Sequence, residues 1–170
     1  MKVILLTHER EVDRPTNTGI LALNVFPEWC SRVIWSRVNP NEQILALLAS
    51  EQAGVLFPKS EKELDSEVGL PLKTELDGAA KYLDKPPLTI IILDATWQEA
   101  RKMLRQSPYL KAANKYALTQ RAQSQFTLRR NQVQGGLCTL ECIIEMCHLT
   151  GMNTEVLELE QVFSQFNQQK

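Results

Sequence analysis

The stretch 88–106 constrains the fold more than any other part of the chain. Residues 88–93 (LTIIIL) are all aliphatic or β-branched, which predicts a strand buried on both faces. The apolar run stops at residues 94–97 (DATW), and residues 98–105 continue as a helical sequence. A buried strand that leads into a helix is typical of an α/β fold, in which ligands bind beyond the carboxyl ends of the strands. We therefore expect Asp94 to lie at such an edge.

Asp94 and Thr96 also have a purely structural interpretation. Both side chains accept hydrogen bonds from backbone N–H groups, so either can cap the helix that follows. Capping does not account for Trp97, a large aromatic ring at the first turn of that helix. A carboxylate and an indole together mark the end of this strand as a candidate site.

Strand-like and helix-like segments alternate along the rest of the chain. The further predicted strands are 2–7, 30–35, 54–58 and 115–119, and the further predicted helices are 20–26, 40–50, 138–150 and 154–166. This alternation predicts an α/β fold, with a mostly parallel sheet and helices on both faces. The charged segment 59–85, which contains glycine and proline, is predicted to be a helix and loop insertion over the sheet. With 170 residues and 44% apolar composition, the chain is expected to form one domain.

Distinctive residues follow four of the predicted strands, and parallel strands share one carboxyl edge. These residues are Thr16–Gly19, Ser36-Arg37, Leu56–Pro58 and Asp94–Trp97. The first of them is either an ordinary helix start or a group of exposed N–H donors for an anion. Its Gly19 allows the backbone to approach a neighbour closely. One carboxylate, one indole, an apolar edge and anion-binding helix starts suit a flat heterocycle with a charged tail.

The distribution of charge is more informative than its total. The net charge is −1, which predicts neither a nucleic-acid nor a membrane partner. Between residues 101 and 130, however, there are eight cations and no carboxylate: Arg101, Lys102, Arg105, Lys111, Lys115, Arg121, Arg129 and Arg130. This stretch is compatible with an ordinary solvated surface and with a phosphate-binding surface.

Several classes of protein are disfavoured by what the sequence lacks. The four cysteines form no Cys-x-x-Cys pair, so we expect no metal site and no disulfide framework. No glycine-rich nucleotide-binding motif and no Gly-x-Ser-x-Gly elbow is present. Residues 2–6 are too short an apolar run for a signal peptide, and no run approaches the roughly 18–20 apolar residues of a membrane span. We expect a soluble, cytoplasmic protein without a membrane partner.

The segment 94–103 (DATWQEARKM) resembles the signature of the DTW-domain family. Five further segments that are similar to this family stand around it in order: 16–19 (TNTG), 35–37 (WSR), 56–58 (LFP), 126–129 (FTLR) and 138–141 (CTLE). The resemblance covers most of residues 5–149. Phe126 departs from it, because tyrosine is usual at that position.

The resemblance implies an enzyme that transfers the 3-amino-3-carboxypropyl group from S-adenosylmethionine to N3 of a uridine in tRNA and releases methylthioadenosine. In that reaction Asp94 would accept the N3 proton or orient the base. Trp97 would pack near the cationic sulfur. Thr18 and Thr139, each near a helix start, would hold the carboxylate of the donor.

Two further groups of residues follow from the same resemblance. Leu56, Pro58 and Ala100 would line the adenine pocket. The RNA phosphates would be bound by Arg37, Arg101, Arg121 and Arg129. No metal is implied.

The family looks related to the enzymes that add the same group to ribosomal RNA, whose fold is like that of the knotted SPOUT methyltransferases. The resemblance therefore implies a SPOUT-like fold with a C-terminal trefoil knot. Pattern alone would not predict a knot, because true knots are rare. Many family members carry a cysteine-rich, zinc-type module ahead of the first strand. We expect this chain to be a single DTW domain over residues 1–170 without that module, and to be a monomer.

Two other functions stay open from the sequence. One is a SPOUT-type RNA methyltransferase on the same scaffold. The other is a non-catalytic RNA-binding domain, whose affinity for RNA would depend strongly on salt.

Overall fold

The protein is built around a parallel β-sheet. The computed structural model describes residues 1–58, 82–83, 85–118, 123–128 and 136–168. In this part of the chain six strands form one sheet in the order β2-β1-β5-β3-β6-β4, and every strand pairing is parallel. The strands are β1 (Lys2–Thr7), β2 (Cys30–Ile34), β3 (Ala53–Leu56), β4 (Tyr82–Leu83), β5 (Thr89–Asp94) and β6 (Lys115–Tyr116). The predicted α/β class is confirmed.

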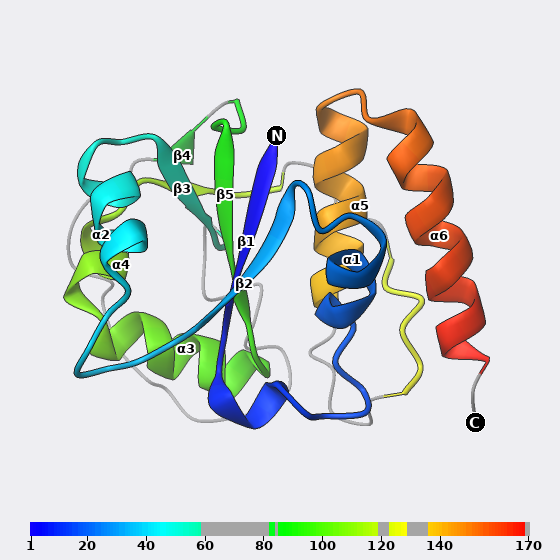
Figure 1. Cartoon of the computed structure of the whole chain (residues 1–170), viewed down its shortest axis with the longest axis horizontal. Helices are drawn as coiled ribbons and strands as arrows, with labels where there is room; N and C mark the ends of the chain where they lie inside the picture. The colour runs from blue at the N-terminus through cyan, green and yellow to red at the C-terminus, as the bar shows by residue number, and fades with distance from the viewer. Residues whose placement is uncertain (59–81, 84, 119–122, 129–135, 169–170) are drawn as a thin grey trace.

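Helices cover both faces of the sheet (Figure 1). One face carries α1 (Gly19–Val25), α5 (Thr139–Leu149) and α6 (Asn153–Asn167). The other face carries α2 (Glu42–Ala49), α3 (Trp97–Gln106) and α4 (Pro108–Ala112). A short 3₁₀ helix, η1 (Glu9–Glu11), follows β1. Within the described residues, no helix has both the length and the apolar character that crossing a bilayer requires.

The two central strands supply both hydrophobic cores. Alternate residues of a strand point to opposite faces. Leu5 and Ile92 therefore pack with α1, α5 and α6, whereas Leu6 and Ile91 pack with α2, α3 and α4. Because both faces are covered, β1 and β5 need apolar side chains on both sides, as their sequences predicted.

Two buried cysteines behave as small hydrophobic groups. Cys30 and Cys147 lie in the core beneath α1, α5 and α6, and neither is in a disulfide. Burial, and secondarily the negative charge of Asp94, raises the pKa of the Cys30 thiol to about 12. Burial also raises the pKa of Cys147, to about 11. Both thiols are therefore protonated near neutral pH.

Three elements differ from the predictions. Ser107 and Pro108 end α3 as expected, but Pro108 then begins α4, where its missing N–H is not needed at the first helical position. The strand β4 lies inside the segment predicted as a helix and loop insertion, most of which falls outside the described residues. The last predicted strand is shorter than expected and ends at Tyr116.

Candidate active site

A buried carboxylate lies where β5 ends. The Asp94 side chain is on the face covered by α1 and α5, and Asp94 is only 1% exposed. Its Oδ2 accepts hydrogen bonds from the hydroxyl of Thr7 at 3.0 Å and from Nδ2 of Asn17 at 3.0 Å. Its Oδ1 accepts one from the hydroxyl of Thr139 at 2.8 Å. The guanidinium Nη2 of Arg32 lies 3.9 Å from Oδ2. Such a set of donors offsets the cost of burying a charged group.

The partners of Asp94 come from four separate parts of the chain. Thr7 is the last residue of β1 and is directly paired with Asp94 in the sheet. Asn17 precedes α1, and its side-chain oxygen accepts from the backbone N–H of Ile20 and from Arg32. Arg32 lies on β2, and Thr139 is the first residue of α5. One carboxylate thus connects two strands and the starts of two helices.

The helix that follows β5 is capped by another residue. The hydroxyl of Thr96 accepts from the backbone N–H of Glu99, and the Glu99 carboxylate accepts from the backbone N–H and the hydroxyl of Thr96. This reciprocal arrangement is a capping box. Asp94 is therefore not the cap, and its side chain is available for the polar cluster described above.

Gly19 brings the start of α1 close to this cluster. A Cβ atom at Gly19 would lie 2.8 Å from Cδ1 of Leu5 and 3.1 Å from Oδ1 of Asp94. The predicted close approach of the backbone is confirmed.

Replacing Gly19 by alanine is expected to lower the free energy of unfolding by about 1–3 kcal/mol, because the new methyl group must displace buried atoms of Leu5 and Asp94. Urea titration followed by circular dichroism measures the change. The matched control is Asn24→Ala, which alters an exposed position of the same helix and should leave the stability nearly unchanged. A Gly19→Ala variant as stable as the wild type would contradict the tight packing.

The structure brings three of the predicted site residues together. Thr18 is buried, and its hydroxyl accepts from the backbone N–H of Leu140 in the first turn of α5 at 3.3 Å. Thr139, the neighbouring residue on α5, is half-buried and donates to Asp94. The starts of α1 and α5 therefore meet above the Asp94 carboxylate.

The residues predicted for an adenine pocket are divided between the two faces of the sheet. Leu56 is half-buried, pairs with Ile92 and packs on the same face as Asp94. Pro58 is half-buried two residues further along. Ala100 is buried in the core on the opposite face, where α3 packs on the sheet, so the structure does not bring it together with Leu56. Trp97 is half-buried at the first position of α3.

The predicted phosphate-binding arginines are described in part. Arg37 is exposed in the segment after β2, and Arg101 is half-buried on α3. Arg121 and Arg129 lie outside the described residues. Among the residues that the structure does describe, no group of three or more His, Cys, Asp or Glu side chains is arranged to hold a metal ion.

Sequence reasoning missed three members of the polar cluster. Thr7 is the one hydroxyl-bearing residue of an otherwise apolar run that follows Lys2, and its place at the strand end was a usable signal. Asn17 stands inside the segment 16–19 but was not singled out. Arg32 gave no local signal, because its partners are distant in the sequence and only the strand order brings them near.

Comparison with known proteins agrees with these features. The DTW domain matches residues 1–170. The chain is also similar to tRNA-uridine aminocarboxypropyltransferase 2 of Drosophila melanogaster, with 28% identity over 145 residues, which is 82% of this chain and 52% of that protein. It thus spans about half the length of this relative. No solved structure matches it. Because the family match extends over the whole sequence and includes the segment around Asp94, the chain belongs to the DTW-domain family.

Proposed function

We propose that this protein transfers the 3-amino-3-carboxypropyl group of S-adenosylmethionine to N3 of a uridine in tRNA. The observation that carries the proposal is the Asp94 carboxylate. It stands in the segment that resembles the family's signature, lies at the carboxyl edge of the sheet and accepts a hydrogen bond from Thr139 at the start of α5. The similar fly protein is named as a tRNA-uridine aminocarboxypropyltransferase, which supports transfer of this group to a uridine in tRNA.

The two threonines near Asp94, together with three residues assigned from the family resemblance, fit the proposed donor. The hydroxyls of Thr18 and Thr139 lie at two helix starts, where an amino-acid carboxylate is favourably bound. Leu56 and Pro58 are half-buried apolar groups suited to an adenine ring. The indole of Trp97 suits a cationic sulfur, which the face of an aromatic ring attracts. We assign Ala100 to the core rather than to this pocket, because it is buried on the other face.

The donor, when bound, supplies an electrophilic carbon whose bond to sulfur breaks as the bond to uridine N3 forms, and the electron pair leaves on the sulfur of methylthioadenosine. The N3 proton needs an acceptor, and we assign Asp94 to that role. Both of its oxygens accept hydrogen bonds in the structure, so one donor must turn away. Thr139 is the half-buried one, whereas Thr7 and Asn17 are buried.

The hydroxyl of Thr139 therefore has two uses in this proposal. It donates to Oδ1 of Asp94 in the structure. When it turns to the carboxylate of the donor, Oδ1 becomes available to the N3–H of uridine. This exchange would couple binding of the donor to exposure of the acceptor atom.

The substrate RNA is assigned to the same edge of the sheet. Arg37 and Arg101 are the described cations that we expect to bind its phosphates, together with Arg121 and Arg129. From the family resemblance we also infer a SPOUT-like fold with a C-terminal trefoil knot. The segments 119–122 and 129–135, which precede α5, lie outside the described residues.

The test is the identity of the released nucleoside. Purified protein is incubated with S-adenosylmethionine and unfractionated tRNA, and the products are separated by chromatography. We expect methylthioadenosine that forms only when tRNA is present. S-Adenosylhomocysteine would identify a methyltransferase instead, and RNA binding without either product would identify a non-catalytic RNA-binding domain.

A further inference from the structure

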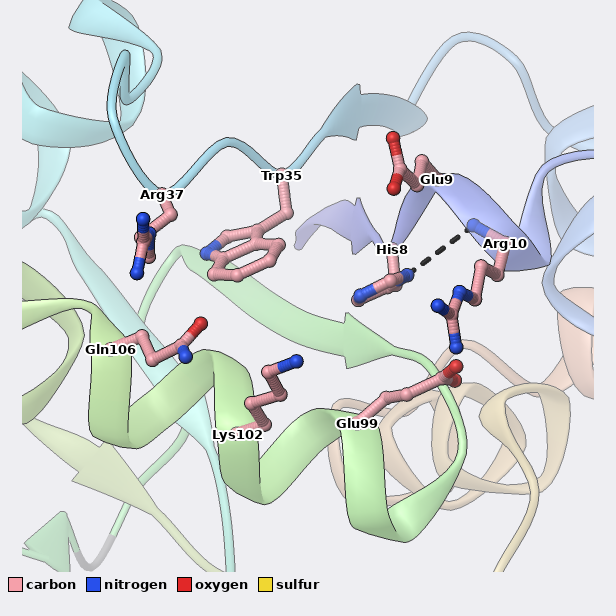
Figure 2. A pocket seen from close by; sticks show the side chains of 8 residues that line it. All are labelled: His8, Glu9, Arg10, Trp35, Arg37, Glu99, Lys102 and Gln106. Carbon is pink, nitrogen blue, oxygen red and sulfur yellow. Dashed lines mark hydrogen bonds between the residues drawn. The ribbon is translucent and has the colours of Figure 1, made fainter.

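A second candidate site lies across the end of β1 from the Asp94 side chain. It is an open pocket of about 250 Å³ between η1, the segment that follows β2, and α3 (Figure 2). The pocket combines two aromatic rings with several long cationic side chains. None of its lining residues belongs to the polar cluster around Asp94.

Two aromatic rings form one wall of the pocket. The rings of His8 and Trp35 stack with their centroids 5.5 Å apart and an interplanar angle of 25°. Nε1 of Trp35 donates to the hydroxyl of Ser107 at 2.9 Å, and Nδ1 of His8 accepts from the backbone N–H of Arg10 at 3.3 Å. Hydrogen bonds thus fix both rings. His8 is buried, whereas Trp35 is half-buried, so the indole is the ring with more accessible surface.

Cationic side chains surround these rings. Arg10, Arg37 and Lys102 are all exposed and line the pocket. In Figure 2, Lys102 rises from α3 toward the two rings and Arg37 lies at one end of the indole. The lining also contains two carboxylates, those of Glu9 and Glu99. Glu99 accepts hydrogen bonds from Thr96 in the capping box. Burial alone would raise the pKa of Glu99, but these hydrogen bonds lower it. An accessible aromatic ring flanked by cations is the combination that binds a single-stranded nucleotide.

The backbone connects this pocket to the Asp94 cluster. His8 directly follows Thr7, and its N–H donates to the backbone carbonyl of Asp94 at 3.1 Å. The side chain of Thr7 faces the Asp94 carboxylate, whereas that of His8 lines the pocket. The pocket and the Asp94 carboxylate therefore lie on opposite sides of the same strand end.

We propose that this pocket binds a nucleotide adjacent to the modified uridine, with its base stacked on Trp35 and its phosphate held by Arg37 and Lys102. The inference rests on the proposed function, because it takes the RNA at Asp94 as given. Stacking on an aromatic ring is tolerant of base identity. The pocket therefore adds affinity and fixes the path of the strand without selecting a sequence.

Binding of short oligonucleotides tests the pocket without any turnover. The probes are an oligoadenylate and an abasic oligoribonucleotide of the same length and charge. Trp35→Leu is expected to weaken binding of the oligoadenylate by about tenfold, since stacking contributes roughly 1–3 kcal/mol per base, and to leave binding of the abasic probe unchanged. Lys102→Gln is expected to weaken binding of both probes and to reduce the salt dependence of log K by about 0.7.

The control is Lys2→Gln, which removes the same charge at the opposite end of β1 and should alter neither probe's affinity. Circular dichroism establishes that each variant is folded, and Lys102→Gln provides an exposed substitution in case Trp35→Leu does not fold. If Lys102→Gln behaves like Lys2→Gln, or if folded Trp35→Leu binds oligoadenylate like the wild type, the pocket assignment is overturned. That result would leave the proposed function standing, because the methylthioadenosine assay tests it separately. If the wild type releases no methylthioadenosine, the proposed function fails, and with it the adjacency to a modified uridine.

Discussion

Replacing Asp94 by asparagine is expected to reduce kcat for methylthioadenosine release by at least about a hundredfold, the smallest usual contribution of a general base. The asparagine side chain has the same size, but its amide cannot accept the N3 proton of uridine. It also turns one oxygen, which now accepts from Thr7 and Asn17 or from Thr139, into a donor. Steady-state kinetics with saturating tRNA measures the effect.

The control for this variant is Asp13→Asn, which removes the same charge from an exposed position near the end of η1. It should retain wild-type kcat. Asp94→Ala measures the contribution of the carboxylate to stability. Alanine leaves the donors of Thr7, Asn17 and Thr139 without their acceptor. We therefore expect the free energy of unfolding to fall by about 3 kcal/mol or more. If folded Asp94→Asn turns over like the wild type, Asp94 is a structural residue only.

Replacing Glu141 by alanine is expected to lower the free energy of unfolding by about 3 kcal/mol, because it leaves three donors without their acceptor. Glu141 is 8% exposed. Its Oε2 accepts from the backbone N–H of Cys138 and the hydroxyl of Ser124, both at 2.8 Å. Its Oε1 accepts from the backbone N–H of Gln125 at 2.6 Å. Urea unfolding followed by circular dichroism measures the loss.

Glu141 holds the described segment 123–128 against the start of α5, two residues from Thr139. Phe126 on that segment is buried and lies 6.3 Å from Phe163, measured between ring centroids. We therefore expect Glu141→Ala to reduce turnover as well as stability. The control is Glu158→Ala, at an exposed position of α6, which should change stability by less than about 0.5 kcal/mol. A loss of less than about 0.5 kcal/mol in the Glu141→Ala variant would contradict this prediction and show that water replaces the lost acceptor.

The sequence predicted those features that depend on local periodicity. Residues 2–7 form β1 with the predicted bounds. The predicted strand 88–93 is shifted by one residue, because β5 is Thr89–Asp94 and Leu88 is exposed outside it. The shared carboxyl edge of parallel strands predicted that the segment 16–19 would meet Asp94, and the family resemblance added Thr139. The structure brings Asp94, Thr18 and Thr139 together. Burial on both faces leaves few alternatives for such strands.

Features that depend on long-range order were not predictable in the same way. Arg32 reaches Asp94 because the sheet order places β2 beside β1 and β1 beside β5, which no local pattern encodes. Ala100 was expected near the adenine through the family resemblance, yet the rotation of α3 buries it in the opposite core. The pocket at Trp35 was missed because its residues come from three elements that are distant in the sequence.

The central claim is that the protein places an aminocarboxypropyl group on uridine. Mass analysis of nucleosides from tRNA that has been incubated with the protein and S-adenosylmethionine tests it most directly. We predict a uridine carrying that group after incubation with the wild type, and none after incubation with Asp94→Asn. A methylated nucleoside, or tRNA unchanged by the wild-type protein, would contradict the claim.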